Sequence, residues 1–133
     1  MIKLKNILLE GKSPSIFIPR RMEDRVERMI KTYIHNGNKG DLDLSNLKLT
    51  KLPDILKDIS VDRDFYCYTN NLTSLENCPK YVGGDFFCNS NKLMSLDGSP
   101  KFVGANFSCF NNPGNFTEQQ VRAVCDVKEM VYV

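Results

Sequence analysis

The feature that most constrains how this chain can fold is an internal repeat with a step of 21 residues. The segment Asp64-Phe65-Tyr66-Cys67 returns as Asp85-Phe86-Phe87-Cys88 and again as Asn106-Phe107-Ser108-Cys109. A looser first copy places Leu42 and Leu44 23 residues before Phe65 and Cys67. A unit this short cannot bury its apolar side alone, so successive units are expected to stack. The aligned columns are Phe65, Phe86 and Phe107; Cys67, Cys88 and Cys109; and Asn70, Asn91 and Asn112.

One copy, Phe65-x-Cys67-x-x-Asn70-x-Leu72, has the spacing of the leucine-rich repeat, with Phe and Cys at the first two apolar places. Over residues 41–113 the chain resembles the short leucine-rich-repeat proteins that are common in tailed-phage genomes. The resemblance implies an α/β solenoid, a stack of about four coils with a parallel sheet. The stack would carry an N-terminal helical cap and a C-terminal cap of a helix and a strand. We expect a segment and linker at 1–18, a capping helix at 19–39, repeats at 40–113 and the C-terminal cap at 114–133.

The cysteines and asparagines of the repeat are expected to belong to the scaffold. A buried thiol behaves as a small apolar group, and a metal or redox role is the alternative. The chain has five cysteines and a single histidine, His35, and no Cys-x-x-Cys pair, so we expect neither a metal nor a cofactor. The asparagines are expected to turn inward, where their amides would satisfy backbone groups left unpaired by the turns.

The segment 20–35 has apolar residues at helical spacing and follows Pro19. Its apolar stripe is expected to cover the first coil. Residues 1–39 carry a net charge of +5, whereas residues 40–133 carry a net charge of −3. The basic residues are interpreted as a solvated helix face, with nucleic-acid binding as the alternative. The stripe consists of Met22, Val26, Met29, Ile30, Tyr33 and Ile34, and the basic patch of Arg20, Arg21, Arg25 and Arg28.

The end of the chain has the pattern of a second cap. Thr117 and Gln120 have the spacing of a capping box, which predicts a helix near 118–125. This helix is expected to bury Val121 and Val124. The apolar residues at 130–133 are expected to close the stack as a last strand.

Alternate residues of a strand point to opposite faces, so the repeat also predicts an outward, concave face. Exposed strand faces are usually polar, and aromatic residues are enriched at interfaces. A row of acids beside aromatic rings therefore indicates a partner protein with a basic, partly apolar patch. The alternative is cross-strand packing that only stabilises the sheet. The candidate partner-binding residues are Asp43, Asp64, Tyr66, Tyr68, Asp85, Phe87, Asn89 and Phe110.

The first ten residues suggest a second possibility. Leu8-Leu9-Glu10-Gly11 resembles the cleavage sites of phage prohead proteases, and a short segment before such a site is similar to capsid-targeting peptides. Cleavage between Glu10 and Gly11 would place the protein in the virion head. Otherwise the expected location is the host cytoplasm, because charged residues interrupt the apolar residues of 1–18, which makes a poor secretory signal, and no apolar run approaches the roughly 20 residues that span a bilayer.

These patterns predict a non-catalytic protein-binding module that acts on a host or phage protein, for example to inhibit a host or defence process. No P-loop, dinucleotide-binding turn or Ser/His/Asp arrangement is present in the sequence. The alternatives are a head-associated protein processed after Glu10 and nucleic-acid binding by the basic helix. Nucleic-acid binding is disfavoured, because the acidic face of the repeat would repel a phosphate backbone. The sequence leaves the oligomeric state open.

Overall fold

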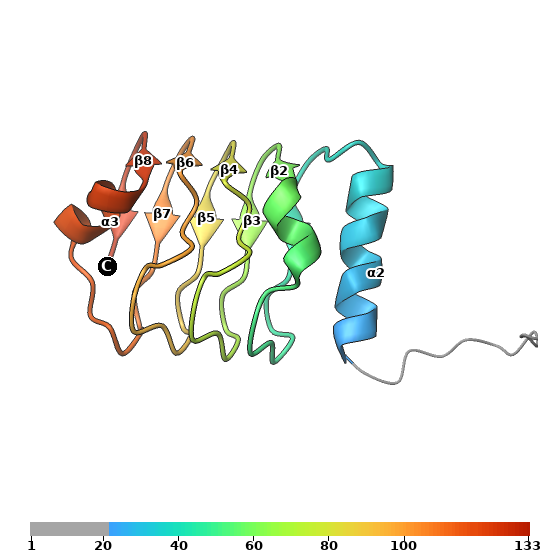
Figure 1. The fold of residues 1–133 in the computed structure, drawn as a ribbon. Coiled ribbons are helices and arrows are strands. Elements are labelled where there is room, and N and C mark those ends of the chain that lie inside the picture. The colour runs from blue at the N-terminus through green and yellow to red at the C-terminus, as the bar shows by residue number, and fades with distance from the viewer. Residues whose placement is uncertain (1–21) are drawn as a thin grey trace, which may run out of the picture.

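The computed structural model describes residues 22–133, which form two parallel sheets with a few helices (Figure 1). The larger sheet contains β1 (Leu42–Asp43), β3 (Phe65–Tyr66), β5 (Phe86–Phe87), β7 (Phe107–Ser108) and β9 (Val131–Tyr132), in that order. The smaller sheet contains β2 (Ser60–Val61), β4 (Tyr81–Val82), β6 (Phe102–Val103) and β8 (Asp126–Val127). The helices are α2 (Met22–His35), α3 (Glu118–Val124) and the 3-10 helix η1 (Asp54–Asp58). This is an α/β arrangement.

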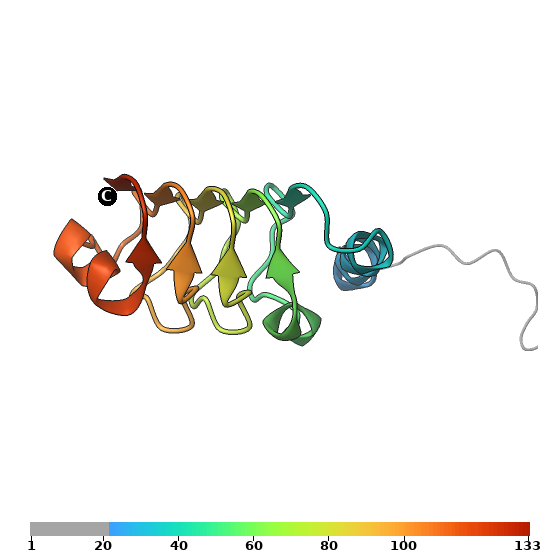
Figure 2. The same cartoon turned by 90° about the horizontal axis from the view of Figure 1, so that it is seen from above.

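The chain alternates between the two sheets, so that each of the first four passes, here called coils, adds one strand to each layer (Figure 2). Phe65 pairs with Leu42 on one side and with Phe86 on the other, which confirms the register of the repeat. The four expected coils are followed by Val131–Tyr132, which adds the predicted last strand to the larger sheet after the repeat pattern has ended.

The second sheet was not predicted from the sequence, which indicated a stack with a single parallel sheet. Its strands are two residues long, too short to show an alternation of polar and apolar residues. They nevertheless pair in the same register, and each points one valine inward. The buried valines are Val61, Val82, Val103 and Val127.

The core lies between the two layers and consists of columns of identical or similar side chains. Phe65, Phe86 and Phe107 are fully buried, with ring centroids 5.8 Å and 5.0 Å apart along the column. The inward-pointing phenylalanines are therefore confirmed. Because coils in register bring the same side chain to the same place, each ring packs mainly on its copy in the next coil.

The asparagine column forms a buried hydrogen-bond ladder, as the sequence predicted. Asn70 Oδ1 accepts from the backbone N–H groups of Leu47 and Leu49, at 3.0 Å and 2.9 Å. Its Nδ2 donates to Leu44 O at 2.9 Å and to Cys67 O at 3.1 Å. Asn91 and Asn112 repeat these contacts one and two coils further on, so each asparagine joins its own coil to the preceding one.

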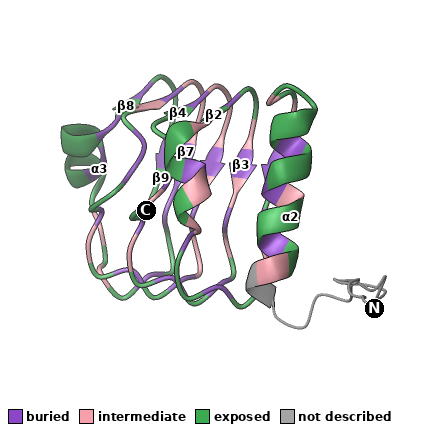
Figure 3. Ribbon diagram, turned by 45° about the vertical axis from the view of Figure 1, so that its right-hand side comes forward, coloured by how far each residue is buried: buried purple, intermediate pink, exposed green. Residues whose placement is uncertain are grey.

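Helix α2 covers the first coil through Val26, Ile30 and Tyr33, which are buried (Figure 3). The Tyr33 hydroxyl donates to Gly40 O at 3.0 Å and accepts from the N–H of Asp62 at 3.1 Å, which holds the helix to the coil. The expectation for Ile34 was wrong: this side chain is 37% exposed, because it lies at the edge of the stripe and turns away from the coil.

The C-terminal cap also forms as predicted, with one exception. Thr117 Oγ1 accepts from Gln120 N at 3.1 Å and Gln120 Oε1 accepts from Thr117 N at 2.9 Å, so the capping box at the start of α3 is confirmed. Val121 is buried, but Val124 is 41% exposed because α3 presents only one narrow face to the stack. The expected burial of Val124 was therefore wrong. Strand β9 closes the larger sheet by pairing with β7.

The side chain of Arg122 on α3 ends the smaller sheet. It donates hydrogen bonds where the backbone N–H groups of a further coil would otherwise donate them. In the preceding coils, Val82 O and Val103 O accept from the backbone N–H groups of Gly104 and Lys128. The corresponding oxygen of the last coil, Val127 O, accepts instead from Arg122 Nη1 at 2.7 Å. Arg122 Nη2 also donates to Glu129 O at 2.6 Å. The guanidinium therefore satisfies two carbonyls at the open end of the stack.

We predict that Arg122→Met lowers the free energy of unfolding by about 1–3 kcal/mol, because two carbonyls lose charged donors while the apolar stem is kept. Arg63→Met is the matched control, since the Arg63 side chain is 71% exposed and its contact to Asp41 is 3.9 Å long. Urea unfolding of both variants measures the difference. Equal stability of the two variants would show that the carbonyls are satisfied equally well by water.

Candidate functional site

Three aromatic rings gather on the outward face of the larger sheet. The rings of Tyr66 and Phe87, on neighbouring strands, are stacked with centroids 5.3 Å apart and planes at 16°. Tyr68 stands edge-on to both, at 6.2 Å from Tyr66 and 6.5 Å from Phe87. All three side chains are half-buried, so the rings pack on one another and still reach the solvent. The structure thus brings these three predicted residues into one cluster.

Two further rings extend this cluster toward the end of the sheet. Phe110 is 45% exposed and Tyr132 is 47% exposed. Tyr132 occupies the same outward column as Phe87, with Ser108 between them in register. Ser108 is only 2% exposed, so little hydroxyl surface separates Phe87 from Tyr132 along this column. We call Tyr66, Tyr68, Phe87, Phe110 and Tyr132 the aromatic surface.

Tyr132 was missed as a site residue in the sequence analysis. The signal was present, because the closing strand was predicted and its alternation places residue 132 outward, next to residue 108. The repeat pattern itself could not indicate it, since the leucines of the motif are absent after Asn112. The register of β9 on β7 is what joins Tyr132 to the face.

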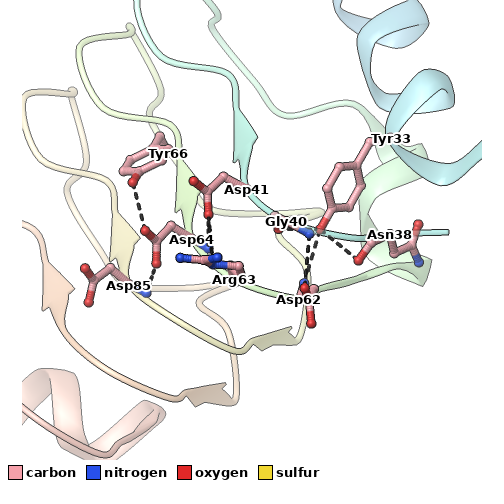
Figure 4. A network of polar contacts seen from close by, with 9 residues as sticks. All are labelled: Tyr33, Asn38, Gly40, Asp41, Asp62, Arg63, Asp64, Tyr66 and Asp85. Atoms are coloured by element: carbon pink, nitrogen blue, oxygen red, sulfur yellow. Dashed lines mark hydrogen bonds and ion pairs between the residues drawn. The ribbon is translucent and has the colours of Figure 1, made fainter. Parts of the chain in front are cut away.

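The acidic column beside the rings is a second hydrogen-bond ladder (Figure 4). Asp41 Oδ1 accepts from Asp64 N at 3.0 Å, and Asp64 Oδ1 accepts from Asp85 N at 2.7 Å. Asp85 Oδ1 then accepts from Asn106 N at 2.9 Å, and Asn106 Oδ1 from Met130 N at 3.0 Å. The column therefore has a structural role that the sequence analysis did not predict, and one carboxylate oxygen of each aspartate is committed to it.

The aspartate ladder also orients the ring of Tyr66, which is part of the aromatic surface. The Tyr66 hydroxyl donates to Asp64 Oδ2 at 2.9 Å (Figure 4). This hydrogen bond, followed by burial and by the negative charges nearby, raises the pKa of Tyr66 to about 12. Tyr66 is therefore a neutral hydrogen-bond donor at neutral pH, and its ring is oriented by a group that is itself held by the backbone.

The other predicted site residues lie around the rings. Asp43 pairs in register with Tyr66, and its Oδ1 accepts from Ser45 N at 2.9 Å. Asn89 is half-buried, and its carbonyl accepts from the backbone of Thr69. Asp43 and Asn89 thus lie on the same outward face as the rings, one coil before Tyr66 and one coil after Tyr68 respectively.

All five cysteines are buried, including Cys78 and Cys125, which stand outside the repeat column. Burial raises the pKa of every one of these thiols. They are therefore protonated at neutral pH and shielded from solvent, the opposite of what a nucleophilic or metal-binding thiol requires. Within residues 22–133, no group of three His, Cys, Asp or Glu side chains is arranged to hold a metal ion.

The predicted basic patch is only partly described. Arg20 and Arg21 lie outside the described residues, while Arg25 and Arg28 are exposed on α2. Acidic residues alternate with these arginines along the helix, and Glu27 Oε1 lies 3.7 Å from Lys31 Nζ. The described part of α2 therefore presents a face of mixed charge. Glu10 and Gly11 also lie outside the described residues, so processing between them stays a prediction.

In the described part of the chain, no helix has the length and apolar character needed to cross a membrane. Comparisons with family models, with curated proteins and with solved structures gave no match. The class that the fold defines is a small α/β protein with two parallel sheets. Its candidate site is the aromatic surface of the larger sheet.

Proposed function

We propose that this chain is a non-catalytic protein-binding module of the phage leucine-rich-repeat type, and that it holds its partner on the aromatic surface. The observation that carries the proposal is the cluster of five rings on one outward sheet face. A solvated face of a parallel sheet is rare, and aromatic rings are enriched at the centres of protein interfaces. Cross-strand packing explains the contact of Tyr66 with Phe87, but not the exposure of Phe110 and Tyr132.

The rings are held before a partner arrives, which favours binding. Tyr66, Tyr68 and Phe87 pack on one another, and the Tyr66 hydroxyl is tied to Asp64. A preformed surface loses little side-chain freedom on association, so more of the contact energy appears as affinity. The carboxylates of Asp43 and Asp85 flank the rings. The partner is therefore a protein with an apolar patch bordered by lysine or arginine.

The stacked architecture supports the finer assignment of the fold as a solenoid of leucine-rich type. Each coil contributes one strand to the larger sheet, and the second, third and fourth coils each contribute one buried asparagine to the ladder. The resemblance to phage proteins places the partner among host or phage proteins, and the module in the host cytoplasm during infection. Blocking a host or defence protein is the action we propose.

We predict that a photo-crosslinking residue at position 110 captures the partner in infected host cells, whereas the same residue at position 94 does not. Met94 is the control because it is 69% exposed and lies outside the aromatic surface. The captured protein is identified by mass spectrometry and its affinity is measured with both proteins purified. Tyr66→Ala with Phe87→Ala should weaken binding at least about 30-fold, since the loss of even one central aromatic residue costs about 2 kcal/mol or more.

Two results would contradict the proposal. One is capture of the same protein with equal yield at positions 94 and 110. The other is an unchanged affinity in the double variant, provided that its circular dichroism spectrum matches that of the parent. Lys92→Ala with Met94→Ala serves as the matched control, since it also removes two exposed side chains but leaves the rings in place.

A further inference from the structure

The smaller sheet carries a second aromatic pair, on residues that the proposed function does not use. Tyr81 and Phe102 are paired in register on β4 and β6, and their rings are stacked with centroids 5.0 Å apart and planes at 4°. Tyr81 is 45% exposed, and Phe102 is half-buried. The two sheets form separate layers, so this pair and the aromatic surface lie on different faces of the molecule (Figure 2).

Two lysines flank this pair at equivalent places of the repeat. Lys80 and Lys101 directly precede Tyr81 and Phe102, and Lys101 N donates to Lys80 O at 2.8 Å, which shows that the two residues are neighbours in register. Both side chains are exposed. No ion pair between residues of the described range 22–133 involves either lysine. Like charges in adjacent register positions repel, so an anionic group bound between them would be stabilising.

Two acids stand at the two ends of this surface, and both are already engaged. Asp126, which follows Phe102 in register, lies 3.3 Å from Lys128 Nζ. Asp62, one coil before Gly83, accepts from the backbone of Gly40 at 3.0 Å. The positive charge is therefore confined to the middle of the surface, beside the rings.

We propose that Lys80, Tyr81, Lys101 and Phe102 form a second interaction surface, which binds a short acidic segment of a protein. Carboxylates of the segment lie at the two lysines, and an apolar or aromatic side chain lies against the free face of Tyr81. That face is open because the preceding strand carries the small Ser60 in the same column.

A single-stranded nucleic acid fits this surface less well. Bases bind by stacking on ring faces. One face of Phe102 is covered by Tyr81 and the other by Lys128, whose Nζ lies 5.7 Å from the ring centroid. Only Tyr81 has a free face, so successive bases have no platform. Asp62 and Asp126 at the two ends would also repel a continuous phosphate backbone, whereas a protein segment can place its acids in the middle only.

The test uses the full-length, isotope-labelled protein and three probes. The first is a short synthetic peptide that alternates glutamate with tyrosine, the second has glutamine for glutamate, and the third is a short single strand of thymidylate. We expect the acidic peptide to shift the amide resonances of residues 80–82 and 101–103, and the glutamine peptide to bind more weakly. Lys80→Gln with Lys101→Gln should lower the affinity about three- to tenfold, because exposed ion pairs are individually weak.

Lys51→Gln with Lys92→Gln is the matched control, since both lysines are exposed, lie away from the smaller sheet, and carry the same charge. This variant should bind within about twofold of the parent. The proposal is overturned by an unchanged affinity in the Lys80/Lys101 variant, by equal binding of the glutamine peptide, or by tighter binding of the thymidylate strand. Shifts confined to Tyr66 and Phe87 would also overturn it and would assign the acidic peptide to the aromatic surface instead.

Discussion

Replacing Asn91 by alanine is expected to lower the free energy of unfolding by about 3–5 kcal/mol, a large part of the stability of a domain this small. Asn91 Oδ1 accepts from Leu72 N at 3.0 Å, and its Nδ2 donates to Cys67 O at 3.0 Å and to Cys88 O at 3.1 Å. The side chain is 7% exposed, so alanine would leave the buried Leu72 N–H without its acceptor, while Cys67 O and Cys88 O would each lose one of their two amide donors. Urea unfolding followed by circular dichroism measures the loss.

Asn71→Ala is the matched control, because it makes the same chemical change at an exposed side chain of the repeat. Its effect should stay within about 0.5 kcal/mol, as for most surface substitutions. A loss for Asn91→Ala that is no larger than for Asn71→Ala would mean that water enters and replaces the amide. The ladder would then be a consequence of the stacking and would contribute little to its stability.

The second large effect is expected at two adjacent phenylalanines with opposite roles. Phe86 is fully buried between Phe65 and Phe107, whereas its neighbour Phe87 points outward and is half-buried. Phe86→Ala should lower the free energy of unfolding by about 3–5 kcal/mol, since it opens a cavity in the middle of the column. Phe87→Ala should cost only about 1 kcal/mol, the value of a partly exposed aromatic pair.

When binding is measured in place of stability, substitution of Phe87 should have a larger effect than substitution of Phe86. Phe87→Ala removes a central ring of the aromatic surface and should weaken the partner's affinity by more than about tenfold. Phe86→Val keeps part of the buried volume and does not reach the surface, so folded protein of this variant should bind like the parent. If Phe86→Val weakens binding as much as Phe87→Ala while remaining folded, the affinity depends on the packing of the sheet and not on the exposed rings.

These two expected results together would separate the residues that stabilise the repeat from those that bind the partner. The inward columns stay apolar or carry the ladder asparagine, with Phe, Cys and Asn repeated through the second, third and fourth coils. The outward columns vary from coil to coil: the position of Tyr66 and Phe87 carries Asp43 in the first coil and Ser108 in the fourth. Variation on a constant scaffold is how repeat proteins obtain specific surfaces.

Much of the fold follows from local patterns. The 21-residue step predicted the pairing of Phe65 with Phe86 and the inward asparagines, while helical spacing and a capping box predicted the caps at 20–35 and 118–125. These predictions succeed because equal spacing brings equal residues into register, and register decides both burial and hydrogen bonding. The outward direction of Tyr66, Tyr68 and Phe87 follows from the same alternation.

Other features were decided only when the coils came together. The smaller sheet forms because the returns of successive coils lie side by side, although two-residue strands leave no pattern in the sequence. The acidic column became a ladder because each Oδ1 reaches the N–H of the next coil, a distance that the spacing of residues alone does not give. The sequence did not indicate that the Arg122 side chain ends the smaller sheet, because its hydrogen bond to Val127 O depends on where α3 lies in the folded protein.

The sequence by itself determined the repeat, its register and the residue types that face inward, because these depend only on period and polarity. The tertiary structure decided which outward residues touch: the stacking of Tyr66 on Phe87, the inclusion of Tyr132, and the pairing of Tyr81 with Phe102. The physical reason is that such contacts join residues of different coils, and their distances are fixed by the separation and twist of the stacked strands.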